Sequence, residues 1–176
     1  MKKRYGILKN TKGELGNFAI IGLGKLGGFE LTYFSDLDLI FIHSGNGTSN
    51  GLIKINSQEY WIKLIQRLIS CLSTITRNGY AYKLDTRLRP SGNAGVLVTP
   101  LDVYLKYHEK SQPWEHQALI KGRVISGIGG EKWFKKVQEG IRKAVYEWIT
   151  PENIDSQINH LRIRKEKELS HENRHK

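Results

Sequence analysis

Two short motifs stand close together near the start of the chain, Gly22-Leu-Gly-Lys-Leu-Gly-Gly28 and Ser35-Asp-Leu-Asp38. The first overlaps residues 18–23, an apolar run bounded by glycines that predicts a buried strand. The second opens residues 36–43, whose acidic start and apolar body predict the next strand, and residues 25–33 between them predict a short helix. This order predicts an α+β fold in which a glycine-rich turn precedes a strand that begins with two acids.

The glycine spacing admits two other interpretations. Gly22-x-Gly24-x-x-Gly27 after a strand matches the dinucleotide fingerprint, which places a pyrophosphate at a helix N-terminus. In that fingerprint the ribose-binding acid ends the second strand, whereas Asp36 and Asp38 begin theirs. A P-loop fits less well, because Leu26 follows Gly24-Lys25 where Ser or Thr would hold the metal.

The aspartates are better interpreted as a pair. Strand side chains alternate, so Asp36 and Asp38 project from one face with about 6–7 Å between their Cα atoms, close enough to share a magnesium site. A third acid, Asp85, lies on a later predicted strand and shares its face with Lys83 and Arg87. If the two strands pair, three carboxylates converge and repel one another unless a cation is present. The competing interpretation is a turn cap, an Arg pair and a surface charge, and the motif context favours the metal site.

The other elements are predicted from periodicity and turn residues. Asn56 and Glu59 form a capping-box signature before a strongly periodic helix that extends to Leu72. Further predictions are a loop at 44–50, a half-buried strand at 80–87, a loop at 90–95, a short strand at 96–98, a helix opened by Thr99-Pro100, helices at about 114–126 and 131–149, and a polar helix from Pro151. The second half of the chain is therefore expected to be helical.

The composition bounds the class of protein. Among 176 residues, 28 Lys and Arg against 17 Asp and Glu give a formal net charge of +11, and 39% hydrophobic residues exclude wholesale disorder. No apolar run approaches the roughly 20 residues that span a bilayer, so we expect a cytoplasmic protein with no membrane partner. The lone Cys71 permits no internal disulfide. The positive charge suits nucleic acid, an acidic protein or a phosphate-rich substrate, and much of it lies in the polar tail after residue 160.

Five motifs in matching order and spacing make the sequence resemble the glutamine synthetase adenylyltransferase (glutamate–ammonia-ligase adenylyltransferase) family. They are Gly24-Lys-Leu-Gly-Gly28, Glu30-Leu31, Ser35-Asp-Leu-Asp-Leu-Ile-Phe41, Leu84-Asp-Thr-Arg-Leu-Arg-Pro-Ser-Gly92 and Trp114-Glu-His-Gln-Ala-Leu119. The resemblance runs from about Gly16 to Gly127 and is closest to the C-terminal, adenylating half of such proteins. It implies the polymerase-beta-like nucleotidyltransferase fold: a mixed β-sheet with flanking helices, followed here by a helical C-terminal segment.

The resemblance also implies an activity, a set of site residues and partners. The activity is Mg2+-dependent transfer of AMP from ATP to a tyrosine hydroxyl of glutamine synthetase, which regulates nitrogen assimilation. Glutamine synthetase is the expected partner, and nucleic acid is not expected as one. The expected residues are Asp36, Asp38 and Asp85 as catalytic acids and ligands of Mg2+, with two ions expected, and Gly27, Gly28, Ser35, Arg87, Arg89 and Lys25 as nucleotide-binding residues.

Family members carry two nucleotidyltransferase halves, and 176 residues accommodate one of them. We therefore expect a fragment, with residues 1–127 as the nucleotidyltransferase domain and residues 128–176 as the start of a truncated helical region. A separate polypeptide carrying the missing half is then a second expected partner. The alternative function is a catalytically incomplete fragment that acts as a nucleotide- or protein-binding module.

Overall fold

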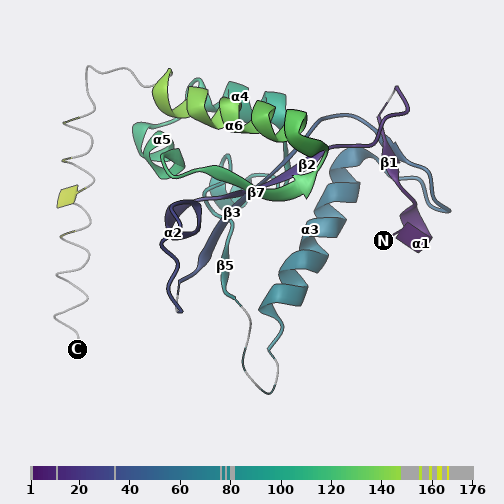
Figure 1. The fold of residues 1–176 in the computed structure, drawn as a ribbon, viewed down its shortest axis with the longest axis horizontal. Helices are drawn as coiled ribbons and strands as arrows, with labels where there is room; N and C mark the ends of the chain where they lie inside the picture. The colour runs from purple at the N-terminus through teal and green to yellow at the C-terminus, as the bar shows by residue number, and fades with distance from the viewer. Residues whose placement is uncertain are drawn as a thin grey trace.

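A mixed β-sheet with helices on both faces forms the body of the computed structural model (Figure 1). The structure describes residues 2–147 except 11, 34, 76, 78, 80 and 81, together with residues 155, 159, 162, 163 and 166. In chain order the elements are α1 (Lys2–Tyr5), β1 (Leu8–Lys9), β2 (Phe18–Gly22), α2 (Gly24–Gly27), β3 (Leu37–His43), β4 (Thr48–Ser49), α3 (Ser57–Ser73), β5 (Leu84–Asp85), the 3-10 turn η1 (Gly92–Ala94), β6 (Thr99–Pro100), α4 (Leu101–His108), α5 (Pro113–Leu119), β7 (Arg123–Ile128) and α6 (Gly130–Tyr146).

Strand β3 lies at the centre of a five-stranded sheet in the order β5-β3-β2-β7, with β6 also paired to β3. Strand β2 is antiparallel to both β3 and β7, whereas β5 and β6 run parallel to β3. The sheet is therefore mixed, as predicted. The two parallel partners bond different parts of β3, with β5 beside Leu37 and Asp38 and β6 beside Ile42 and His43.

One face of the sheet packs against α4, α5 and α6. Apolar residues of β2 and β3, such as Ile21 and Ile40, meet helix residues such as Tyr104, Leu119 and Ile141 in one buried cluster. Helix α6 follows β7 directly and packs against α5, α4 and β7. Asp36 and Asp38 alternate with the odd-numbered residues of β3, so they lie on the same face as Ile40 and these helices.

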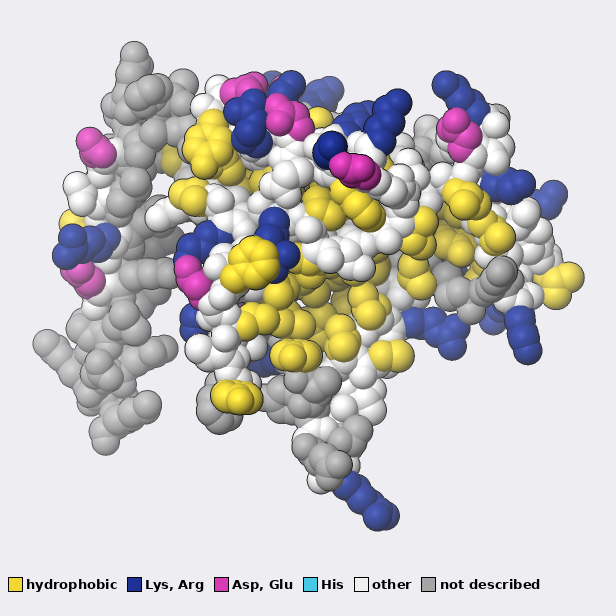
Figure 2. Space-filling view, viewed as in Figure 1, with side chains coloured by type: hydrophobic (Ala, Val, Ile, Leu, Met, Phe, Trp, Pro, Cys, Tyr) yellow, Lys and Arg dark blue, Asp and Glu magenta, His cyan; other side chains and the backbone are white. Residues whose placement is uncertain are grey.

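The other face packs against α3. Phe18 stacks on Trp61 of α3 with ring centroids 4.9 Å apart, and Leu39 and Phe41 complete this second cluster. The predicted cap is confirmed, because the Asn56 side chain accepts a hydrogen bond from the Glu59 backbone N–H. Figure 2 shows hydrophobic side chains gathered on this side of the molecule, below β7 and between α2 and α3.

The predicted helix at about 114–126 is confirmed over its first half and wrong after residue 119. Helix α5 ends at Leu119, and residues 123–128 form strand β7, which pairs with β2. Apolar residues at 119, 120, 124 and 125 have helical spacing. This local pattern carries no information about β2, the strand distant in sequence with which residues 123–128 pair. The expectation that the second half of the chain is helical is corrected in the same way.

Several other boundaries differ from the predictions. Helix α2 covers four residues rather than most of 25–33, and the strand expected at 96–98 is β6 at 99–100. Of the strand expected at 80–87, residues 80 and 81 lie outside the described residues, and the described part contains only β5. The loop expected at 44–50 contains β4, which pairs with β1. Residues 148 and 149 of the predicted last core helix lie outside the described residues, as does most of the predicted helix from Pro151. Within the described part of the chain, no helix combines the length and apolar character needed to cross a bilayer.

Candidate active site

The parallel pairing of β3 with β5 places two of the predicted acids side by side. Asp38 and Asp85 are Cα partners in this ladder, and the Leu37 N–H donates to the Lys83 carbonyl at 2.8 Å. Paired residues of neighbouring strands project from the same face, and Asp36 shares the face of Asp38 because it lies two residues earlier. The backbone therefore gathers all three acids at one edge of the sheet.

The acids also share an electrostatic environment. The pKa of Asp38 is raised above its ordinary value, first by burial and then by the negative charges of Asp85 and Asp36. Arg87 opposes this increase but does not cancel it. Burial and the charges of Asp85 and Asp36 each penalise the ionised form of Asp38. The site thus concentrates negative charge where a cation would relieve the repulsion.

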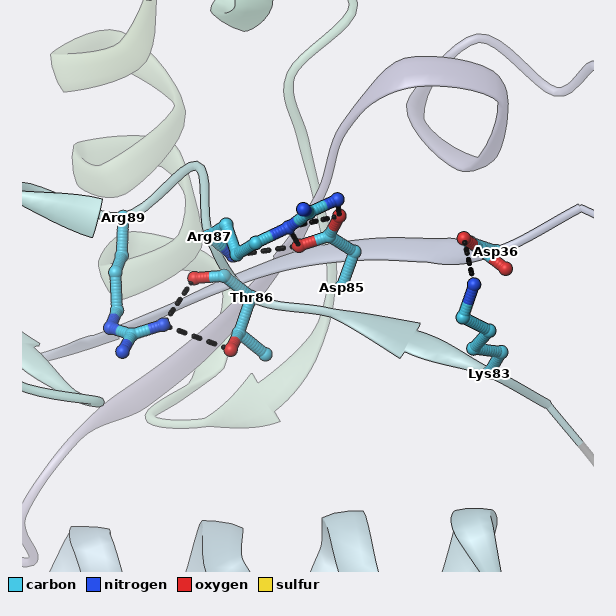
Figure 3. Close-up of polar contacts among 6 residues, drawn as sticks. All are labelled: Asp36, Lys83, Asp85, Thr86, Arg87 and Arg89. Atoms are coloured by element: carbon cyan, nitrogen blue, oxygen red, sulfur yellow. Dashed lines mark hydrogen bonds and ion pairs between the residues drawn. The ribbon is translucent and has the colours of Figure 1, made fainter. Parts of the chain in front are cut away.

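Basic side chains supply countercharge to Asp36 and Asp85, as Figure 3 shows. The Arg87 guanidinium donates from Nε to Asp85 Oδ2 at 2.9 Å, and the Arg87 backbone N–H donates to Asp85 Oδ1 at 2.8 Å. These hydrogen bonds lower the pKa of Asp85. Lys83 Nζ lies 3.3 Å from Asp36 Oδ2. Asp36 and Asp85 therefore each face a cationic neighbour.

The residues fit a divalent cation in kind and in backbone placement, but their oxygens are not arranged around a common point. Among the described residues, no group of three or more His, Cys, Asp or Glu side chains is placed to hold a metal ion. The physical reason is that Asp36 is directed to Lys83 and Asp85 to Arg87. Carboxylate oxygens are the ligands that Mg2+ prefers. The metal-ligand role of the three acids stays a prediction.

The glycine turn lies directly against Asp38. Gly24 has φ of +49°, in the left-handed region, and a Cβ at this position would overlap Asp38 Oδ2. The Leu23 N–H donates to the Asp38 carbonyl at 2.9 Å. Position 24 requires a glycine because a side chain would be strained at this positive φ and would displace the Asp38 carboxylate.

Gly27 and Gly28 have local roles within this turn. Their backbone N–H groups donate to the carbonyls of Leu23 and Gly24, at 2.8 and 3.0 Å. A Cβ on Gly27 would overlap the Lys121 carbonyl oxygen, so the close approach here is to protein backbone. The structure accounts for Gly27 through packing, and the contact of both glycines with nucleotide stays a prediction.

The remaining predicted residues divide by exposure and partner. Arg89 donates to the Thr86 carbonyl at 2.6 Å and to the Gly95 carbonyl at 3.3 Å, so it braces the loop after β5 (Figure 3). Ser35 Oγ lies 2.8 Å from Thr32 Oγ1 and accepts from the Thr32 N–H. Arg87 and Lys25 are exposed. Of the two arginines, Arg87 is the one that lies at the acids.

Sequence reasoning missed Arg123. Its guanidinium donates from Nε to the Gly27 carbonyl at 2.9 Å and from Nη2 to the Leu26 carbonyl at 3.1 Å. It was hidden because residues 114–126 were predicted as a helix, whereas Arg123 pairs with Gly22 at the start of β7. The glycine before it and the β-branched Val124-Ile125 after it are typical of a strand that starts after a turn.

Comparison with known proteins adds a family. The model of the family described as glutamate-ammonia ligase adenylyltransferase matches residues 1–138. The chain is similar to bifunctional glutamine synthetase adenylyltransferase/adenylyl-removing enzymes: 46% identical to that of Alteromonas mediterranea over 82% of this chain, 44% to that of Hahella chejuensis over 80%, and 44% to that of Vibrio parahaemolyticus over 72%. The chain spans about 15% of the length of the first two relatives and 14% of the third.

Proposed function

The chain belongs to the glutamate-ammonia ligase adenylyltransferase family, a family of nucleotidyltransferase enzymes, and we propose that it moves AMP from ATP to a tyrosine hydroxyl of glutamine synthetase with the help of Mg2+. The α+β architecture, a mixed sheet with helices on both faces, is of the nucleotidyltransferase type. The relatives' name supports glutamine synthetase as the target and an adenylyl group as what is transferred.

One observation carries the proposal: Asp38 and Asp85 are in register on parallel strands, with Asp36 on the same face and the glycine turn against Asp38. A structural role for such a set is hard to support, because Asp38 is a half-buried carboxylate whose pKa is raised by burial and by the charges of Asp85 and Asp36, and its ionised form opposes folding. Sites of this kind are retained where the charge is used. We propose that Asp36, Asp38 and Asp85 hold two Mg2+ ions and the triphosphate between them.

The basic side chains at the site have a proposed part in this. Lys83 and Arg87 are the counterions of Asp36 and Asp85 in the structure. Both are largely exposed, so either side chain is free to swing away when a divalent ion and a nucleotide enter. Once released from Asp85, Arg87 would bind the phosphate oxygens with its planar fork.

The reaction is an in-line displacement at the α-phosphorus. A bond forms between the tyrosine oxygen and the α-phosphorus. The bond between the α-phosphorus and the oxygen that bridges it to the β-phosphorus breaks, and pyrophosphate leaves. When bound, Mg2+ supplies positive charge to the triphosphate oxygens and fixes their orientation. We propose that Asp85 accepts the tyrosine proton and that Arg87 neutralises charge on the departing pyrophosphate.

The other nucleotide-binding residues take supporting parts in the proposal. Lys25 is exposed on α2 and is available to phosphate, next to the turn formed by Gly27 and Gly28. Ser35 and Arg89 act through the loops that they hold, since their hydrogen bonds are to Thr32 and to Thr86 and Gly95. These assignments rank Arg87 above Arg89 as the arginine that contacts nucleotide.

The test is transfer to the target itself. The purified 176-residue chain is incubated with ATP, Mg2+ and glutamine synthetase, and the intact mass of the target is measured. We expect the mass of one adenylyl group per modified subunit, on a tyrosine, and no addition when the chain carries Asp38→Asn. An unmodified target in the presence of a folded, nucleotide-binding chain would reject the proposal.

A second function has its own supporting observation. The chain spans about 15% of the relatives' length, and two of its three acids, Asp36 and Asp85, are paired with Lys83 and Arg87, which favours a nucleotide- or protein-binding module that needs a further polypeptide for turnover. This function predicts ATP binding without transfer, and transfer that appears when the missing half is added as a separate chain.

We also propose a division of the chain into a nucleotidyltransferase part, residues 1–127, and the start of a helical region, residues 128–176. The boundary falls at the end of β7. Helix α6, the described helix of the second part, packs onto the core of the first. A cut at residue 127 would therefore expose this shared buried cluster.

A further inference from the structure

The carbonyls at the end of α2 need hydrogen-bond donors. This helix has four residues, Gly24–Gly27, and the last carbonyls of any helix lack partners within it. Arg123 supplies two donors, to Gly27 and Leu26, from a strand far along the chain. A half-buried guanidinium with two fixed acceptors holds the turn in one position.

The same guanidinium lies on an aromatic ring. The Arg123 Cζ is 3.7 Å from the centroid of Phe29, which places the cation over the ring face. Phe29 has φ of +60°, which is unfavourable for a bulky side chain, and its side chain is 81% exposed. A strained backbone persists only where neighbouring contacts maintain it, and Arg123 provides such a contact.

Lys121 also contacts the turn. Its carbonyl oxygen occupies the space that a Gly27 side chain would take, and its Nζ lies 2.6 Å from Glu30 Oε2. Residues 121–123 therefore contact the carbonyls at the end of α2 and Gly27 itself. They also contact Phe29 and Glu30, which follow the turn.

The turn in turn fixes the surroundings of Asp38. The Cα of Gly24 lies against Asp38 Oδ2, and the Leu23 N–H binds the Asp38 carbonyl. A shift of the turn thus changes the space around this carboxylate. Arg123 contacts the turn and Phe29, and through them it determines where the turn meets the acid.

We infer that Arg123 is a positioning residue, which holds the Gly24–Gly27 turn against Asp38 and so aligns the nucleotide site without contacting the reacting atoms. The role in alignment rests on the proposed function, whereas the hold on the turn does not. A misplacement of about 1 Å at a reacting centre costs on the order of 100-fold in rate. Arginine is needed because lysine keeps the charge but lacks the fork that reaches two carbonyls.

The test compares Arg123→Lys with Arg142→Lys in the full chain. Arg142 is a matched control, since it pairs with Glu139 and Glu147 on the exposed side of α6. In hydrogen–deuterium exchange without nucleotide, we expect the amides of residues 23–28 to exchange roughly fivefold faster or more in Arg123→Lys and to be unchanged in Arg142→Lys. In the transfer assay, we expect kcat to fall about 10- to 100-fold with little change in the KM for ATP.

Phe29→Leu keeps the inference testable if Arg123→Lys does not fold. It removes the ring face from an exposed position, and we expect a smaller increase in exchange confined to the same residues. Unchanged exchange of residues 23–28 in Arg123→Lys, or faster exchange with an unchanged kcat, would overturn the inference. A wild-type chain that transfers no AMP would reject the proposed function, and the exchange measurement would still decide whether Arg123 holds the turn.

Discussion

At the scale of single residues, the charge of Asp38 opposes folding. Its pKa is raised by burial and by Asp85 and Asp36, so the protonated form is favoured in the folded state relative to the unfolded chain. Asp38→Asn removes this penalty at neutral pH. We expect AMP transfer to fall by roughly 10²–10³-fold or more, while the melting temperature stays the same or increases. Asp102→Asn, at an exposed acid of α4, is the control.

Activity assays and thermal melts of the two variants measure both effects. Normal transfer by Asp38→Asn would remove this acid from the catalytic site. A large decrease in its melting temperature would instead assign Asp38 a structural role.

Arg87 and Arg89 are close in sequence but have different environments. Arg87 is exposed and binds Asp85, whereas Arg89 is half-buried and bonds the carbonyls of Thr86 and Gly95. We expect Arg87→Gln to reduce transfer with little change in melting temperature, and Arg89→Gln to destabilise the fold by about 1–2 kcal/mol, because two half-buried carbonyls lose their donor. Urea unfolding and transfer rates of both variants check this, and the reverse pattern would exchange the two roles.

At the scale of elements, the turn after β2 distinguishes its two adjacent glycines. A Cβ at position 27 would overlap the Lys121 backbone, whereas a Cβ at position 28 would meet the flexible Lys121 side chain. We expect Gly27→Ala to cost about 1–3 kcal/mol and to reduce transfer, and Gly28→Ala to cost less than about 1 kcal/mol. Unfolding free energies of the two variants are the measurement. Equal costs would mean that the contact with residues 121–123 does not constrain the turn.

Helices α4 and α5 contain a buried histidine pair, His108 and His116. His108 Nδ1 and His116 Nε2 both lie 3.0 Å from Ser111 Oγ, and His116 Nδ1 lies 2.5 Å from the Ala144 carbonyl. Among the described residues, the structure gives His108 Nε2 no hydrogen-bond partner. Burial, followed by repulsion from His116, lowers the pKa of His108 from 6.5 to about 4.

This shift predicts loss of stability in acid. The unfolded chain binds the His108 proton below its ordinary pKa of 6.5, and the folded chain binds it only near 4, so stability falls as the pH decreases through this interval. We expect unfolding to become about 2 kcal/mol easier between pH 7.5 and pH 5 on account of this group. Urea unfolding of wild type and His108→Phe at the two pH values tests it. An equal pH dependence in both would show that His108 does not titrate as described.

The elements that were predicted correctly have local signals. The strand around residues 18–22, the acid pair that opens β3 and the capped helix α3 are all visible in consecutive residues. Strand β7 was missed because its stability comes from β2, about a hundred residues earlier in the chain, and not from its own periodicity. The pairing of Asp38 with Asp85 was predicted only on condition that the strands pair, since register is a tertiary property.

At the scale of the whole molecule, the sheet unites three segments that the sequence keeps far apart. The glycine turn and the acid pair come from one segment, Asp85 from a second and Arg123 from a third, and all meet at one end of the sheet. The sequence motifs identified the first two segments. The choice of Lys83 and Arg87 as counterions depends on side-chain conformations within this assembly, so it could not be predicted from residue spacing.

The central claim is that the acids of β3 and β5 take up a divalent cation together with a nucleoside triphosphate. Titration of the chain with Mn2+ in the presence of a non-hydrolysable ATP analogue, followed by the electron paramagnetic resonance signal of free Mn2+, measures this without a target protein or a missing half. We predict that the wild-type chain removes more Mn2+ from solution than the analogue alone removes, and that Asp38→Asn and Asp85→Asn remove no more than the analogue alone. Equal uptake by the wild type and both variants would contradict the account.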